Sequence, residues 1–76
     1  MTTLNELNVN DSAKIIKFKP NNSAYRNQLL AIGLTPGTTF KVIRKAPLGD
    51  PITISIRGSI ISLRKKEAEI LELEKL

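Results

Sequence analysis

The chain has 76 residues, and its 12 basic against 7 acidic residues give a formal net charge of +5. We expect one small domain over residues 1–76. A chain of this size buries only about 60% of its unfolded surface, so its stability should be modest. Cysteine and histidine are absent, which excludes disulfides, thiolate metal sites and the usual general base of neutral-pH catalysis. The composition therefore predicts no enzyme, no cofactor and no tight transition-metal site.

The N-terminal part shows no targeting or membrane signal. No apolar run approaches the roughly 20 residues that span a bilayer, and the first six residues lack the features of a secretory signal. We expect a soluble, cytoplasmic protein. Leu4 and Leu7 should pack on the fold as an N-terminal arm, followed by a polar turn over 8–12.

The first strand is expected over 13–18. Alternation along a strand places Ile15 on one face and both Ile16 and Phe18 on the other. A helix over 24–32 should follow.

Ser23 suits the N-cap of this helix, because its hydroxyl can accept a hydrogen bond from a free backbone N–H. Tyr25, Leu29 and Ile32 lie at i, i+4 and i+7 and form one apolar stripe. A helix of nine residues is unstable alone, so the stripe must pack on a sheet.

A helix end and a tight turn follow. Gly33 tolerates the positive φ that commonly ends a helix. Pro36 and Gly37 suit the two central positions of a type II turn. The next strand, over 39–45, points Phe40 and Val42 to one face and Lys41, Ile43 and Lys45 to the other.

The C-terminal half predicts three more strands. In 52–57 three isoleucines alternate with three polar residues. Gly58 should make a tight reversal into a strand over 59–64, with Ile61 and Leu63 facing the core. One helical turn over 65–69 and a last strand over 70–75 complete the chain.

Five short strands and one short helix predict a mostly β fold, a small SH3-like antiparallel barrel. Closure would hide sheet edges that so small a sheet cannot otherwise protect. An OB-fold is the structural alternative, but its helix normally lies between the third and fourth strands. Here the helix follows the first strand.

The charge is unevenly distributed. Residues 12–66 contain eleven basic residues and one acid, Asp50, a net formal charge of +10, whereas four glutamates lie between 67 and 74. A basic body suggests attraction to an anionic partner, although solvated strand faces explain the same charges. The glutamates offer at most a weak, oxygen-only surface site, so we predict no metal site.

Nucleic-acid binding is a second possibility, since a basic body gains from phosphate contacts. Single-strand readers need aromatic platforms, however, and Phe18, Tyr25 and Phe40 all lie in apolar stripes. We therefore expect no nucleic-acid partner. A free-standing nucleic-acid-binding or metal-responsive module remains the alternative function.

Three stretches together resemble the FeoA family. They are 25–30 leading to Gly-Leu-Thr-Pro-Gly-Thr at 33–38, Ala-Pro-Leu-Gly-Asp-Pro-Ile at 46–52, and 57–66. The resemblance covers nearly the whole chain. It implies an SH3-like accessory protein of bacterial Fe²⁺ uptake that works with FeoB, a membrane permease with a cytosolic GTP-binding domain. Related domains also occur in iron-responsive repressors, joined to a DNA-binding part that this sequence lacks.

On this basis the helix and the proline-bracketed loop are the expected contact with the permease. The loop is stiff and loses little entropy on docking, while basic residues steer the protein to an acidic patch or to the anionic inner leaflet. The alternatives are ordinary core packing for Leu30 and a structural brace for the loop. The predicted partner-binding residues are Arg26, Leu30, Lys41, Lys45, Pro47, Leu48, Gly49, Asp50, Arg57 and Arg64.

Overall fold

The computed structural model describes residues 3–20 and 23–76. Five strands, two α-helices and one 3₁₀-helix make up this part of the chain. In chain order they are η1 (Leu4–Glu6), β1 (Ser12–Phe18), α1 (Ser23–Ala31), β2 (Thr39–Lys45), β3 (Ile52–Ile56), β4 (Ser59–Leu63), α2 (Lys65–Ala68) and β5 (Leu71–Lys75). The mostly β class and the five strands confirm the prediction.

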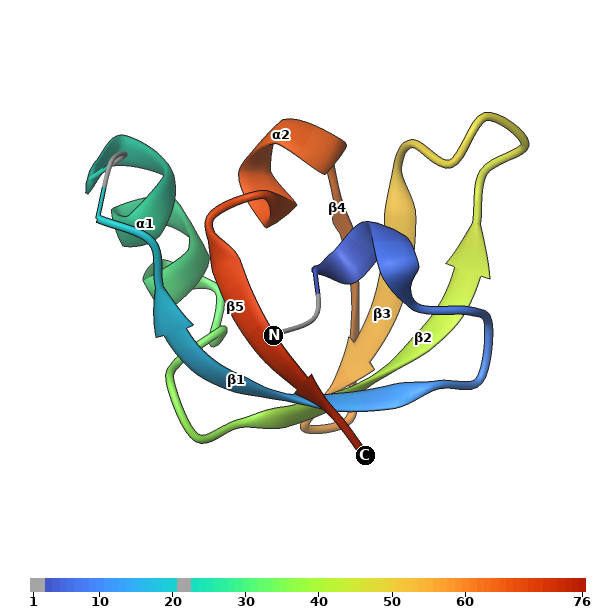
Figure 1. Cartoon of the computed structure of the whole chain (residues 1–76), viewed down its shortest axis with the longest axis horizontal. Helices are drawn as coiled ribbons and strands as arrows, with labels where there is room; N and C mark the ends of the chain where they lie inside the picture. Colours follow the sequence, from blue (N-terminus) through green and yellow to red (C-terminus); the bar gives the residue numbers. More distant parts are fainter. Residues whose placement is uncertain (1–2, 21–22) are drawn as a thin grey trace.

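The strands form one strongly bent antiparallel sheet in the order β4-β3-β2-β1-β5. In Figure 1, α1 lies at one side of the sheet, and η1 and α2 lie across its concave side. Among the described residues no ladder joins β4 to β5, so the sheet is open. The predicted barrel closure is therefore incomplete, and β4 and β5 remain as sheet edges.

The core fills the concave side of the sheet. Leu4 and Leu7 are buried in it, which confirms the packing of the N-terminal arm. The other fully buried large side chains come from α1, the turn after it and all five strands. They are Ile15, Leu29, Leu34, Val42, Ile52, Ile54, Leu63, Leu71 and Leu73.

A bulge in β1 changes the face of the sheet to which Phe18 points. Ile15 pairs with Leu73 and Lys17 with Glu72 on β5, which leaves Ile16 unpaired between them. A bulge shifts the alternation by one residue, so Phe18 packs against the same core as Ile15. The prediction that Phe18 faces away from Ile15 was wrong.

The end of α1 is a Schellman motif. The N–H of Gly33 donates to Leu30 O at 3.1 Å, and the N–H of Leu34 donates to Leu29 O at 3.0 Å. Gly33 has φ +100°, as its predicted role requires. Leu34 is buried while Ile32 is 42% exposed. Ile32 was therefore wrongly placed in the apolar stripe, because the chain turns before it can reach the sheet. The predicted capping by the Ser23 side chain lies outside what the structure describes.

The next turn has the predicted form. Thr38 N–H donates to Thr35 O at 3.1 Å, and Gly37 between them has φ +89°. These contacts fit the predicted type II turn. In the following strand, Phe40 and Val42 are buried, as expected.

The β3–β4 hairpin departs from the sequence prediction at two positions. Ile56 pairs with Ser59, so Arg57 and Gly58 form a two-residue turn with φ +51° and +82°. Arg57 was expected as a strand residue and instead lies in the left-handed region. Thr53 faces outward between Arg44 and Ser62 but is only 7% exposed.

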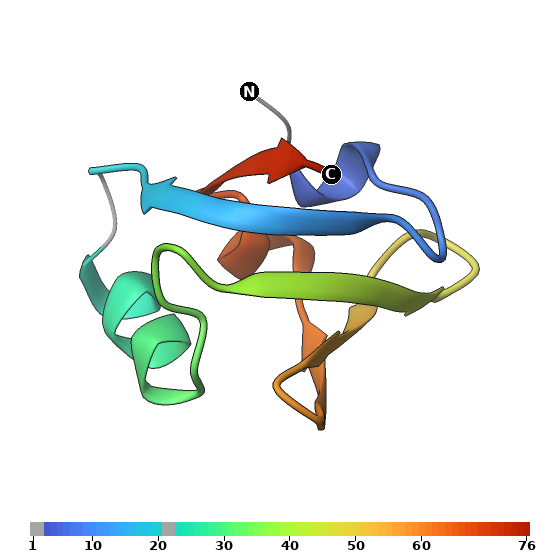
Figure 2. The same cartoon turned by 90° about the horizontal axis from the view of Figure 1, so that it is seen from below.

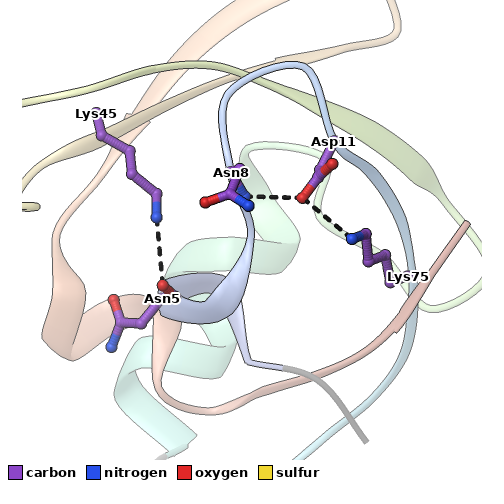
Figure 3. A network of polar contacts seen from close by, with 5 residues as sticks. All are labelled: Asn5, Asn8, Asp11, Lys45 and Lys75. Carbon is purple, nitrogen blue, oxygen red and sulfur yellow. Dashed lines mark hydrogen bonds and ion pairs between the residues drawn. The ribbon is translucent and has the colours of Figure 1, made fainter.

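A polar network ties the N-terminal segment to the sheet (Figure 3). Asp11 Oδ2 accepts the N–H of Asn8 at 2.8 Å and lies 3.5 Å from Lys75 Nζ on β5. The Asn8 N–H, and secondarily Lys75, lower the pKa of the Asp11 carboxyl below its ordinary value of 3.8. Lys45 Nζ on β2 donates to Asn5 O at 3.2 Å.

Candidate partner-binding surface

The α1 part of the predicted surface is exposed to solvent. Arg26 and Leu30 are exposed on α1, where they flank the buried Leu29, and Leu30 is 37% exposed. Leu30 is therefore partly available for contact with a partner.

The loop between β2 and β3 is held by its own backbone. Ala46 N–H donates to Pro51 O at 3.1 Å, and Gly49 N–H donates to Ala46 O at 2.7 Å. The Asp50–Pro51 peptide bond is cis. Leu48, at the tip, is 94% exposed and is the most exposed large apolar side chain among the described residues. The loop thus presents an apolar side chain on a constrained backbone.

Asp50 ties this loop to α2. Its Oδ1 accepts the N–H of Lys65, the first residue of α2, at 3.0 Å. Arg64 precedes α2, and its backbone N–H donates to Glu67 Oε1 at 2.9 Å. Asp50 therefore bonds across the fold to α2 and braces the loop.

The helix and the loop do not form one surface. In Figures 1 and 2, α1 and the 46–51 loop lie at opposite ends of the molecule. A partner that covers Leu48 therefore contacts a different face from one that covers Leu30. The predicted contact through α1 and the predicted contact through the loop are therefore alternatives and do not form one interface.

The predicted cations differ in their surroundings. Lys41 is exposed on β2, whereas Lys45 holds η1 through Asn5. Arg57 donates from one guanidinium nitrogen to the buried Thr38 hydroxyl at 3.2 Å, and that hydroxyl lies 2.8 Å from the hydroxyl of Thr35. One guanidinium donor of Arg57 is therefore used within the fold, at the hairpin tip.

Two shallow depressions lie on the described surface. One, of about 330 Å³, is lined by residues of both charges, namely Tyr25, Asp50, Arg64, Lys66 and Glu67. The other, of about 350 Å³, has two cations and two hydroxyls and no carboxylate in its lining. Its residues are Arg44, Lys45, Ala46, Pro47, Pro51, Thr53 and Ser62. The second depression is suited to anionic groups and joins the loop to the outer face of the sheet.

On that outer face the sequence predicted Lys41 as a contact residue but not the apolar side chains beside it. Ile43 on β2 and Ile60 on β4 are exposed there. Ile43 is unpaired between Val42 and Arg44, at a bulge opposite β3. A sequence signal for this face did exist: 59–63 is a strand segment without a charged residue.

Residues 3–20 and 23–76 lack the features of two further kinds of site. This part of the chain has no group of three or more Asp, Glu, His or Cys residues that could hold a metal ion. It also has no helix long and apolar enough to cross a membrane.

Comparison with known proteins gives a family match over nearly the whole chain. The model of the FeoA domain matches residues 2–75. A curated relative, the Fe(2+) transport protein A/Fe(2+) transporter FeoB fusion protein of Porphyromonas gingivalis, is 34% identical over 71 residues. The match covers 93% of this chain but only 8% of the fusion protein.

Solved structures share the fold. Iron(II) transport protein A from Clostridium thermocellum is 32% identical with a TM-score of 0.90, over 99% of this chain and 46% of that one. FeoA of Stenotrophomonas maltophilia, described as a prokaryotic SH3 domain protein complexed with zinc, is 25% identical with a TM-score of 0.81. That match covers 97% of this chain and 91% of the other. The predicted SH3-like fold is thereby confirmed.

Proposed function

The chain belongs to the FeoA family, which is linked to ferrous iron transport, and on this premise we propose that it is an accessory protein of bacterial Fe²⁺ uptake. It acts by binding a FeoB-type transporter on the cytosolic side of the membrane. The observation that carries the proposal is the P. gingivalis relative, in which a domain similar to this chain and the transporter are one polypeptide. Such a fusion keeps the two parts at high effective concentration.

We further propose that residues 1–76 act as one domain through contact alone, without a reaction of their own. The exposed features support contact. Leu48 stands at the tip of a hydrogen-bonded loop, and an apolar anchor on a constrained backbone loses little entropy on docking. The net charge of +5 favours approach to an acidic surface.

The test is a binding measurement with the purified FeoB-type transporter in detergent. Leu48→Asp places a charge at the loop tip, and Leu30→Asp places the same charge at the opposite end of the molecule, which makes the two variants matched controls. We expect Leu48→Asp to weaken binding about tenfold or more, the loss typical of a contact-centre residue. Leu30→Asp should bind like the unmodified chain.

Both variants must first show an unchanged thermal unfolding transition. Absence of any binding by the unmodified chain would refute the proposed function. Binding unchanged in Leu48→Asp would remove the loop from the contact, and a selective loss in Leu30→Asp would move the contact to α1.

A further inference from the structure

The two edges of the sheet are protected to different degrees. β5 carries Glu72, Glu74 and Lys75, and charged side chains are a common defence of an edge strand against pairing. β4 has the sequence Ser-Ile-Ile-Ser-Leu, without a charge or a proline. Its Ile60 is 65% exposed. Because β4 lacks such protective charges, its edge is open to the addition of another strand, whereas the charged edge of β5 is not.

The hairpin register shows which backbone groups β4 offers. Paired residues in an antiparallel ladder alternate between hydrogen-bonded and non-hydrogen-bonded positions. Ile56 and Ser59 flank the two-residue turn and take a hydrogen-bonded position. Ile60 and Ser62 therefore take the alternate positions, and their N–H and C=O groups point away from β3. Both residues are exposed.

Basic side chains predominate around β4, although Asp50 and Glu67 lie near its Arg64 end. No acidic residue occurs in β2, β3 or β4. Arg57 and Arg64 flank β4 at its two ends, and Arg44 shares an outer-face row with Thr53 and Ser62. This row continues into the depression that has two cations and no carboxylate. An added strand with acidic side chains would meet complementary charge at Arg57 and at Arg44.

The same charges oppose pairing between two copies of this chain. In an antiparallel β4–β4 contact, Arg57 of one copy approaches Arg64 of the other at each end. Like charges placed opposite each other are destabilising, so the flanking arginines disfavour a homodimer through this edge. A partner segment of opposite charge has no such penalty.

We propose that the free edge of β4 accepts an extended, acidic segment of the partner transporter as a sixth strand of the sheet. This inference rests on the proposed function and adds the β4 edge to the loop tip as a contact with the transporter. Backbone bonds to Ile60 and Ser62 supply the pairing, Ile60 supplies apolar contact, and the surrounding arginines select the acidic segment.

The decisive variant is Ser62→Pro, with Ser62→Ala as its control. Both lose the hydroxyl that lies 3.2 Å from the Thr53 hydroxyl. Only proline removes the outward N–H, and an edge position whose N–H faces solvent is where a strand tolerates it. Transporter binding should weaken about tenfold in Ser62→Pro and less than about twofold in Ser62→Ala, consistent with the loss of one interface hydrogen bond.

A second measurement does not depend on the folding of the proline variant. Amide hydrogen exchange of the unmodified chain is compared with and without the transporter, and Ile60 and Ser62 should become protected in the complex. Charge is tested with Ile60→Glu and Ile60→Lys: the glutamate should weaken binding more, because it repels an acidic segment.

The outcomes separate the two proposals. No binding by the unmodified chain refutes the proposed function, and this inference with it. Binding without protection at Ile60 and Ser62, or equal affinity of Ser62→Pro and Ser62→Ala when both are folded, overturns the β4 inference alone. Sedimentation of the chain by itself as a dimer that Ser62→Pro dissociates would assign the edge to a second copy and also overturn it.

Discussion

At the scale of single residues, Arg57 combines an unfavourable backbone with a fixed side chain. Its φ of +51° lies in the left-handed region, which costs roughly 1–2 kcal/mol for a residue with a Cβ atom. The guanidinium donates to the buried Thr38 hydroxyl at 3.2 Å, and a part-buried bond of this kind offsets some of that cost. Arg57 thus occupies a turn position that asparagine or glycine usually fills.

We expect Arg57→Val to destabilise the fold by roughly 2 kcal/mol, because a β-branched side chain is strongly disfavoured at positive φ and the bond to Thr38 is lost. Arg57→Asn should change stability by less than about 1 kcal/mol, since relief of the turn and loss of the bond oppose each other. Urea unfolding of the three proteins measures this. Equal losses in both variants would show that the turn geometry is not the cause.

Asp11 predicts an acid-sensitive contribution to stability. Its folded-state pKa is lowered, first by the Asn8 N–H and then by Lys75. A carboxyl with a lowered folded pKa stabilises the fold above its unfolded pKa and loses that effect as the pH falls through the folded value. Asp11→Asn should therefore be less stable than the unmodified chain at pH 7, and the difference should shrink below about pH 4.

Thermal unfolding of both proteins between pH 2 and pH 7 measures this difference. Glu69→Gln, on an exposed residue, serves as the control for the loss of one negative charge. A difference that stays constant over the whole range would contradict the assignment to Asp11.

At the scale of elements, local patterns predicted where strands and turns lie, and bulges decided the exceptions. The bounds of 39–45 agree with β2, and the roles of Gly33 and Gly58 are as expected. Phe18 was misplaced because Ile16 bulges, and bulges depend on pairing with a distant strand.

The candidate surface was harder to predict for a related reason. No local sequence pattern shows that α1 and the 46–51 loop lie at opposite ends of the molecule, or that β4 has no second neighbour among the described strands. Lys45 and Asp50 appear as free charges in the sequence, yet both are used by contacts across the fold, to Asn5 and Lys65. Sequence spacing does not contain such long-range pairings.

The C-terminal end of α1 allows a prediction about stability. Gly33 has φ +100° and open space where a Cβ atom would lie, so Gly33→Ala strains the backbone without a clash. We expect a loss of about 1 kcal/mol. Gln28→Ala, on an exposed position of α1, is the control and should be close to neutral. Calorimetric unfolding measures both, and a neutral Gly33→Ala would show that the Schellman geometry contributes little.

At the scale of the whole molecule, the net charge of +5 predicts how binding of the chain to nucleic acid depends on salt. Contacts with phosphate groups alone give weak binding that falls steeply with salt. We expect a fluorescence-anisotropy titration with duplex and single-stranded DNA to show binding at low salt and none near physiological salt. Tight binding that persists at roughly 150–200 mM salt would favour the nucleic-acid-binding alternative over the transporter contact.

The packing of Tyr25 against the core has a practical use. The chain has one tyrosine and no tryptophan, and this tyrosine belongs to α1 and contacts the buried cluster. Intrinsic ultraviolet emission therefore reports on the attachment of one helix, while far-ultraviolet circular dichroism reports mainly on the strands. Coincident melting curves from these two optical probes would show that helix and sheet unfold cooperatively, and an earlier fluorescence change would show that the helix detaches first.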